Sequence, residues 1–155
     1  MEDRYLFKAK HFKEWHIGNI VKEPDGLYIR DIKENVMAYI DDESTICQCT
    51  GLRDKNGNLI WENDVLDFLG HKGAIYFKCG SFGIGYRKNI DWEEIQANIM
   101  RVTGCENLLY ACENDNYISL WEIYWNFNDE NDSVNIVEAI GNIFDNKELL
   151  ESEEK

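Results

Sequence analysis

The chain has 155 residues, 44% of them hydrophobic and 13% aromatic, a length and composition typical of one packed globular domain and not of a disordered chain. The formal net charge of −14 argues against a bare nucleic-acid binder, because phosphate contacts need cationic side chains. Most of this charge lies in residues 61–155, which have a balance of −12 against −2 in residues 1–60. No apolar run approaches the roughly 18–20 residues of a membrane span, so no membrane partner is expected.

The five cysteines are an odd number, which favours a reducing compartment over a disulfide framework. The amino terminus also lacks a signal-peptide core, so the sequence predicts a cytoplasmic protein with all five thiols reduced. Cys47 and Cys49 would point to the same face of a strand, and the other cysteines are scattered. Buried thiols are therefore favoured over a zinc site, which usually has more closely spaced ligands.

Strand patterns dominate the first two thirds of the chain. The clearest is a hairpin in which Trp15–Val21 and Leu27–Ile32 flank Glu23–Gly26, a tetrad of the turn-forming type with proline second and glycine last. The other short apolar runs predict strands at Tyr5–Ala9, Val36–Ile40, Ser44–Thr50, Leu59–Trp61, Asp64–Leu69, Ala74–Cys79 and Ile84–Arg87. Strands this closely spaced predict a mainly β fold, either a small barrel or a curled antiparallel sheet.

The stretch DKNGN, residues 54–58, raises the question of a cation site. Its spacing of Asp and Asn is similar to the start of a calcium-binding loop, but Leu59 and Val65 stand where such a loop needs Gly and Glu. Asn56-Gly57 is instead a strong signal for a type I′ hairpin turn, in which both central residues have positive φ. We therefore expect an exposed hairpin tip without a bound ion.

The hydrophobic period changes after residue 90. Asp91 can cap a helix, and Ile90 and Ile95 have the spacing of a hydrophobic staple. Tyr117–Phe127 is rich in aromatic residues and is interpreted as a strand. The elements predicted in this part of the chain are a helix over 91–100, the strand Tyr117–Phe127 with Trp121, Ile123, Trp125 and Phe127 on one face, the strand Val134–Ile140 and a short helix at Lys147–Glu151.

No sequence motif identifies a catalytic, cofactor-binding or metal-binding site. The three histidines, His11, His16 and His71, have no obvious partner in the sequence, and no nucleotide-binding, zinc-protease or hydrolase motif occurs. Glu62 and Asp64 could act as an acid–base pair or hold a metal ion, but exposure at a strand end is the favoured interpretation. We therefore expect a non-enzymatic protein without a cofactor. An enzyme whose residues meet only in the folded chain is an alternative.

Four aromatic residues form the candidate interface, namely Trp121, Tyr124, Trp125 and Phe127. Aromatic rings can stack nucleic-acid bases, but Glu122 lies among these four and few cations are near. A core or a subunit interface is therefore favoured, since aromatic side chains dominate both. The sequence predicts a homo-oligomer that loosens as salt is lowered, because salt screens the repulsion between acidic copies.

Two blocks of the sequence resemble the signature of the YopX-like proteins of phages and prophages. They are QCTGLRDKNGNLIWENDVL (Gln48–Leu66) and VEAIGNIFDNKELLE (Val137–Glu151). The matching residues are Gln48, Thr50, Gly51, Leu52, Asp54, Gly57, Ile60, Glu62 and Asp64 in the first block and Ile140, Gly141, Asn142, Ile143 and Glu148–Leu150 in the second. Cys49 and Asn63 stand where the family pattern has Tyr and Gly. Asn is the non-glycine residue best able to adopt positive φ, so the tight turn before the next strand can persist.

The resemblance implies a β-rich, phage-borne protein without an established activity. Glu62–Val65 is also similar to the opening of small SH3-like barrels, which is an analogy of fold alone. The expected architecture is a mainly β, at most α+β, domain over residues 1–155, built as an SH3-like barrel or curled antiparallel sheet with one or two short helices. Residues 1–40 are expected to form a hairpin arm packed on a core of residues 44–90 and 134–151.

The functional hypotheses fall into different classes. The leading one is a non-enzymatic phage accessory protein that self-associates and binds protein. The alternative is an acidic decoy that mimics nucleic acid and occupies a basic host protein, which would require carboxylates in a continuous stripe. Direct nucleic-acid binding is not expected under either hypothesis.

Overall fold

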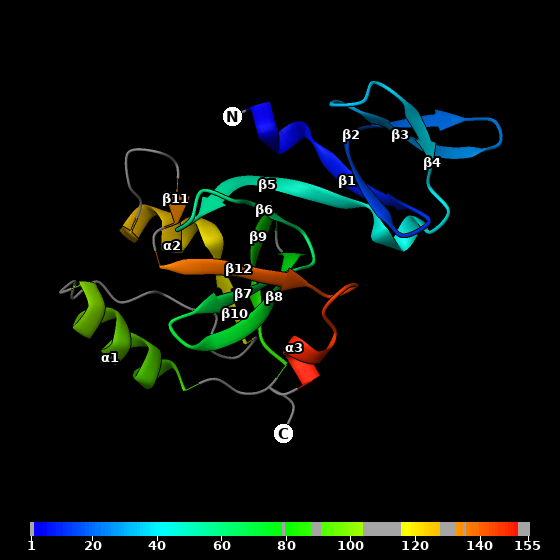
Figure 1. Cartoon of the computed structure of the whole chain (residues 1–155). Coiled ribbons are helices and arrows are strands. Elements are labelled where there is room, and N and C mark those ends of the chain that lie inside the picture. The colour runs from blue at the N-terminus through cyan, green and yellow to red at the C-terminus, as the bar shows by residue number, and fades with distance from the viewer. Residues whose placement is uncertain are drawn as a thin grey trace. The chain divides into compact units, whose positions relative to one another are not determined.

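A computed structural model describes residues 2–78, 80–87, 91–103, 116–127, 133–134 and 136–151. These residues are mainly β, with curled antiparallel sheets, one short parallel pairing and three short α-helices (Figure 1). The mainly β prediction is confirmed in its curled-sheet form, because the described strands do not close into a barrel. The chain divides into two compact units, residues 1–51 and 52–155, and the division falls within strand β5 (Cys47–Asp54).

The first unit is one antiparallel sheet with strand order β5-β1-β2-β3-β4. Its other elements are β1 (Phe7–His11), β2 (Glu14–Glu23), β3 (Gly26–Asp31), β4 (Met37–Tyr39) and the 3₁₀ turns η1 (Glu2–Tyr5) and η2 (Glu43–Thr45). The predicted β2–β3 hairpin is confirmed, and its register pairs Glu23 with Gly26. A small apolar cluster that includes Ala9, Ile29 and Ile40 forms the core of this unit.

The second unit contains a five-stranded antiparallel sheet with strand order β10-β9-β8-β7-β12. Its elements are β6 (Leu59–Trp61), β7 (Asp64–Phe68), β8 (His71–Lys78), β9 (Ser81–Gly85), β10 (Tyr117–Ser119), β11 (Ser133–Val134), β12 (Val137–Asn142), α1 (Trp92–Thr103), α2 (Leu120–Phe127) and α3 (Glu148–Glu151). Strands β6 and β11 pair with the end of β5, and β11 does so in parallel. The main core of the protein lies here, around Phe68, Ile75 and Ile84.

Helix α1 confirms the helix that the sequence predicted over residues 91–100. The Asp91 carboxylate accepts the backbone N–H groups of Glu93 at 3.0 Å and Glu94 at 3.1 Å, which are the unpaired donors of the first turn. Ile95 and Ile99, one turn apart, are buried in the core of the second unit. The predicted staple residue Ile90 lies outside the described residues.

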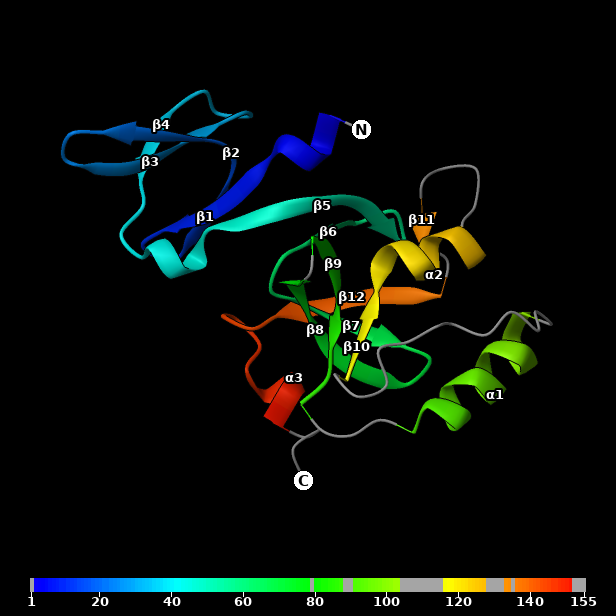
Figure 2. The same ribbon diagram turned by 180° about the vertical axis from the view of Figure 1, so that it is seen from behind.

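The strand predicted at Tyr117–Phe127 is wrong over most of its length. Only Tyr117–Ser119 is extended, and the chain then turns directly into α2, as Figure 2 shows. Leu120, Ile123 and Phe127 are buried at intervals of three and four residues, which is the period of a helix. Burial of this face against the core outweighs the preference of aromatic residues for strands, which depends strongly on context.

Two glycines in β9 allow tyrosine rings to lie against the strand. A Cβ atom on Gly83 would lie 2.3 Å from Cζ of Tyr117, and one on Gly85 would lie 2.5 Å from Cδ2 of Tyr76. At Gly83 the backbone O of Ile118, at 2.6 Å, also excludes a Cβ atom, whereas at Gly85 the ring of Tyr76 would have to shift to admit one. Gly83 therefore lets the ring of Tyr117, on the paired strand β10, lie directly against β9.

Candidate functional site

The buried side chain of Asp54 organises the family motif. Its Oδ1 accepts the backbone N–H groups of Asn56 at 3.0 Å and Asn58 at 2.9 Å, and its Oδ2 accepts that of Ala139 at 2.9 Å. Buried ionisable groups are costly unless hydrogen bonds compensate them, and three backbone donors do so here. Asp54 thus holds the hairpin loop closed and ties it to β12, which is a structural role.

The hairpin tip is confirmed, but its predicted turn type is wrong. The backbone O of Asp54 accepts the N–H of Gly57 at 3.0 Å, and the N–H of Asp54 donates to the O of Asn58 at 2.8 Å. Among the described residues of this loop only Gly57 has positive φ, at 83°, whereas a type I′ turn requires it at two residues. The pattern is that of a type I turn followed by a glycine bulge, because the Asp54 carboxylate stabilises a longer loop.

The turn between β6 and β7 contains Asn63, which departs from the family pattern. Its φ is 68°, so Asn adopts the conformation that glycine would otherwise supply, as predicted. The backbone N–H of Asn63 donates to the backbone O of Ile75 at 2.9 Å, and the backbone O of Asn63 accepts the N–H of Ile143 at 3.0 Å. The turn therefore joins β8 to the segment that follows β12.

The carboxylate of Asp64 is buried, so the prediction that it is exposed at a strand end is wrong. Its Oδ2 accepts the backbone N–H of Trp61 at 2.9 Å, so it closes the same turn. Burial is common in the motif, which has Thr50, Leu52 and Ile60 inside and Gln48 at the surface. Glu62 and Asp64 therefore do not form an exposed carboxylate pair, because the tight turn draws Asp64 inward.

The predicted interface residues lie on α2, where they do not share one face. Trp121 and Trp125 are 42% and 73% exposed, while Phe127 is buried. Tyr124 lies between the tryptophans, with ring centroids 5.4 Å from Trp121 and 5.7 Å from Trp125, both in edge-to-face geometry. Trp121, Tyr124 and Trp125 together form a surface feature that we call the aromatic ridge.

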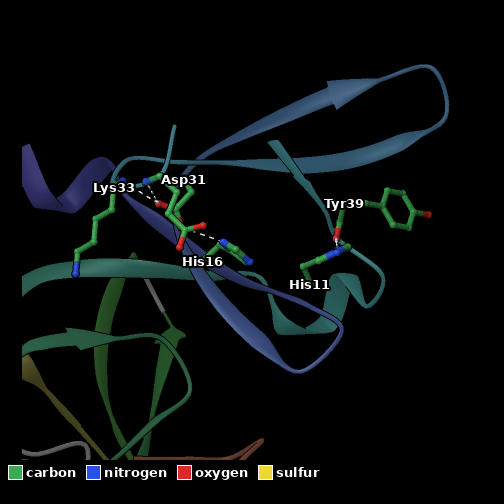
Figure 3. Close-up of polar contacts among 6 residues, drawn as sticks. His11, His16, Asp31, Lys33 and Tyr39 are labelled. Carbon is green, nitrogen blue, oxygen red and sulfur yellow. Dashed lines mark hydrogen bonds and ion pairs between the residues drawn. The ribbon is translucent and has the colours of Figure 1, made fainter. Parts of the chain in front are cut away.

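A polar cluster that the sequence analysis missed lies in the sheet of the first unit. Nδ1 of His16, on β2, lies 2.9 Å from Oδ2 of Asp31, at the end of β3, and both side chains are buried (Figure 3). Oδ1 of Asp31 accepts the backbone N–H groups of Lys33 at 2.8 Å and Glu34 at 2.9 Å. The pKa of Asp31 lies below its usual value. The backbone hydrogen bond from Glu34 is the largest cause, and the contact with His16 and the hydrogen bond from Lys33 add to it, whereas burial acts in the opposite direction.

Glu34 completes this cluster. One ligand atom each from His16, Asp31 and Glu34 lie within 4.8 Å of one another. The fifteen-residue gap between His16 and Asp31 hid the contact from sequence analysis, although antiparallel pairing of β2 and β3 brings them together. The cluster has the donor types of a metal-binding site.

Among the described residues, neither the other histidines nor Cys47 and Cys49 belong to this cluster. His11 is directed to the backbone O of Tyr39 at 2.8 Å, and its ring centroid is 6.2 Å from that of His16. Cys47 and Cys49 are buried thiols in β5, which confirms the thiol interpretation for these two. The other three cysteines lie outside the described residues.

The fold and the motif together define a β-rich protein in which signature carboxylates bind backbone groups. A protein-family comparison matches residues 9–151 to the family described as YopX protein. The match covers nearly the whole chain, so the chain belongs to the YopX family, and the resemblance noted from the two blocks is confirmed. A comparison with curated proteins found no match. None of the helices in the described part of the chain is long and apolar enough to span a membrane.

Proposed function

We propose that this YopX protein is a phage-type accessory protein of the bacterial cytoplasm, non-enzymatic, that binds protein through the aromatic ridge of α2 and forms homo-oligomers by the same surface. The observation that carries the proposal is the 73% exposure of Trp125 beside a partly exposed Trp121. Tryptophan and tyrosine are the residues most often found at the energetic centres of protein interfaces. Isolated exposed apolar residues are ordinary, but a pair of tryptophans on one short helix is not.

The geometry of the ridge favours a rigid contact surface. The edge-to-face contacts of Tyr124 with both tryptophans limit the rotamers of all three rings. Leu120 and Ile123, on the opposite side of the helix, anchor it in the core. Little side-chain entropy is therefore lost when the ridge is covered, which favours binding.

The energetics are consistent with moderate self-association. In a two-fold dimer each ridge would cover the other, so four tryptophans would lose water contact. Full burial of an exposed aromatic side chain contributes about 2–3 kcal/mol, and these tryptophans contribute less because they are 42% and 73% exposed, so they offset only part of the roughly 4–15 kcal/mol cost of association. A micromolar dissociation constant requires about 8 kcal/mol of net free energy, so contacts around the ridge must add to the tryptophan contribution. We expect weaker association at low salt because both copies are strongly acidic.

Sedimentation equilibrium of the full chain tests the proposal. The wild type is expected to self-associate at micromolar concentration and ordinary salt, and Trp125→Ala is expected to remain at the 18.2 kDa of the monomer. Met100→Ala is the matched control, because Met100 is 52% exposed on helix α1 and lies outside the ridge. A monomeric wild type, or equal loss of association in both variants, would refute self-association through the ridge.

The acidic decoy remains a second candidate function on the basis of charge. Residues 52–155 carry a balance of −11 out of the total of −14. A decoy would bind a basic DNA-binding protein in a strongly salt-dependent way and would not need Trp125. Competition between this protein and duplex DNA for such a partner separates the two functions. Loss of competition in Trp125→Ala supports the ridge, and unchanged competition supports the decoy.

A further inference from the structure

The cluster of His16, Asp31 and Glu34 is only partly explained by its role in the sheet. Asp31 closes the turn after β3 by accepting the N–H groups of Lys33 and Glu34, and His16 lies against its second oxygen. That accounts for three contacts of the Asp31 carboxylate. It does not account for the carboxylate of Glu34 at the same place. The buried Nε2 of His16 has no hydrogen-bond partner among the described residues, so it does not fix which ring nitrogen carries the proton.

The donor atoms of the cluster have capacity for an ion. A carboxylate offers about four lone-pair sites, and the contacts of Asp31 use two on Oδ1 and one on Oδ2. One lone pair of Oδ2 is therefore available to a cation. No described residue forms a hydrogen bond with Nε2 of His16. The imidazole can therefore adopt the tautomer with its proton on Nε2, which leaves the lone pair of Nδ1 for a metal ion.

The spacing of these atoms fits the coordination sphere of a small divalent metal ion. Zinc binds nitrogen and oxygen at roughly 2.0–2.2 Å, so neighbouring ligand atoms in a tetrahedral site lie roughly 3.3 Å apart. Nδ1 of His16 and Oδ2 of Asp31 are already 2.9 Å apart. The Glu34 carboxylate lies within 4.8 Å of both atoms, and its exposed, flexible side chain can bring an oxygen to ligand distance.

We propose that His16 Nδ1, Asp31 Oδ2 and the Glu34 carboxylate bind one divalent transition-metal ion of the Zn²⁺ class, with water at the remaining position. One imidazole and two carboxylates are a donor set that suits zinc, whereas Mg²⁺ and Ca²⁺ prefer oxygen ligands alone. The site ties β2 to the turn after β3, so the ion would stabilise the sheet of the first unit. The inference is independent of the ridge on α2.

Calorimetric titration of the reduced, untagged full chain with Zn²⁺ tests the site. The wild type is expected to bind one Zn²⁺ at this site and to show no comparable heat with Mg²⁺. Glu34→Gln is the decisive variant, because the Glu34 side chain is exposed and only its backbone N–H supports the turn. We expect at least about tenfold weaker binding in this variant, since even outer-sphere changes typically cost 10–100-fold.

Two control substitutions separate the site from general attraction of cations to an acidic chain. Glu43→Gln changes an exposed carboxylate elsewhere in the first unit, and His71→Gln changes a histidine outside the cluster. Both are expected to bind Zn²⁺ as the wild type does, while His16→Gln loses the site. Broadening of the His16 imidazole NMR signal by Co²⁺ gives a second readout in folded wild-type protein. Absence of a Zn²⁺ site in the wild type, or equal affinity in Glu34→Gln and Glu43→Gln, would overturn the proposal.

Discussion

The buried carboxylate of Asp54 accepts the backbone N–H of Ala139 at 2.9 Å, although 85 positions separate the two residues in the chain. The same side chain closes the hairpin loop through Asn56 and Asn58. One residue of the family motif therefore connects its two sequence blocks, the first around the hairpin and the second in β12. This contact gives a physical reason for the presence of Asp at this position.

Asp54→Asn is expected to lower the free energy of unfolding by about 2–3 kcal/mol, because the amide NH₂ group would face a backbone donor and leave buried groups unpaired. Urea denaturation measures the loss. Asp67→Asn is the control, since the partly exposed Asp67 carboxylate accepts the N–H of Gly70 at 2.8 Å within its own turn. A loss no larger than that of the control would show that the buried carboxylate does not organise the motif.

Asn63→Ala is expected to cost about 1–2 kcal/mol, since alanine is strained at positive φ. Asn63→Gly should remain within about 0.5 kcal/mol of the wild type, because glycine tolerates the φ of 68° without a Cβ penalty. Thermal and urea unfolding of the two variants give the comparison. Equal stabilities for alanine and glycine would mean that the turn does not require this backbone conformation.

Ile123→Ala is expected to cost about 2–4 kcal/mol, as for other fully buried large-to-small changes. Trp125→Ala, two residues away, should cost less than about 1 kcal/mol because its ring is mostly in water. A strand with both residues on one face would give similar losses for the two changes. Stability measurements on this pair therefore distinguish the helix from the strand.

Thiol titration of the denatured protein is expected to find five free cysteines, as the odd number and the absence of a motif indicate. In the native protein Cys47 and Cys49 should react only as the chain opens, because both are fully buried in β5. The rates of reaction with a bulky thiol reagent, before and after addition of urea, measure this protection. Fewer than five thiols in urea would indicate a disulfide.

Local sequence chemistry predicted those elements whose signals lie within a few residues. The Pro24–Gly26 turn, the Asp91 cap of α1 and the positive φ of Asn63 follow from preferences that need no partner far along the chain. The sequence predicted the wrong type for the turn at Asn56-Gly57, because a side chain outside this pair decides the turn type. The Asn56-Gly57 pair favours a two-residue turn, but the Asp54 side chain supplies hydrogen bonds that stabilise a longer loop.

The sequence by itself determined the mainly β class, the β2–β3 hairpin and the first helix, because alternation of apolar residues and turn chemistry are local properties. It also determined membership of the YopX family, through the residues of the two matching blocks. Tertiary structure decided the rest. The aromatic segment became helix α2 because Leu120, Ile123 and Phe127 find a core on one side only. Pairing of β2 with β3 brought His16 to Asp31, and β12 brought Ala139 to Asp54. Contacts between residues far apart in the chain depend on which strands pair, and the hydrophobic pattern and turn geometry define the register only once the partner strand is known.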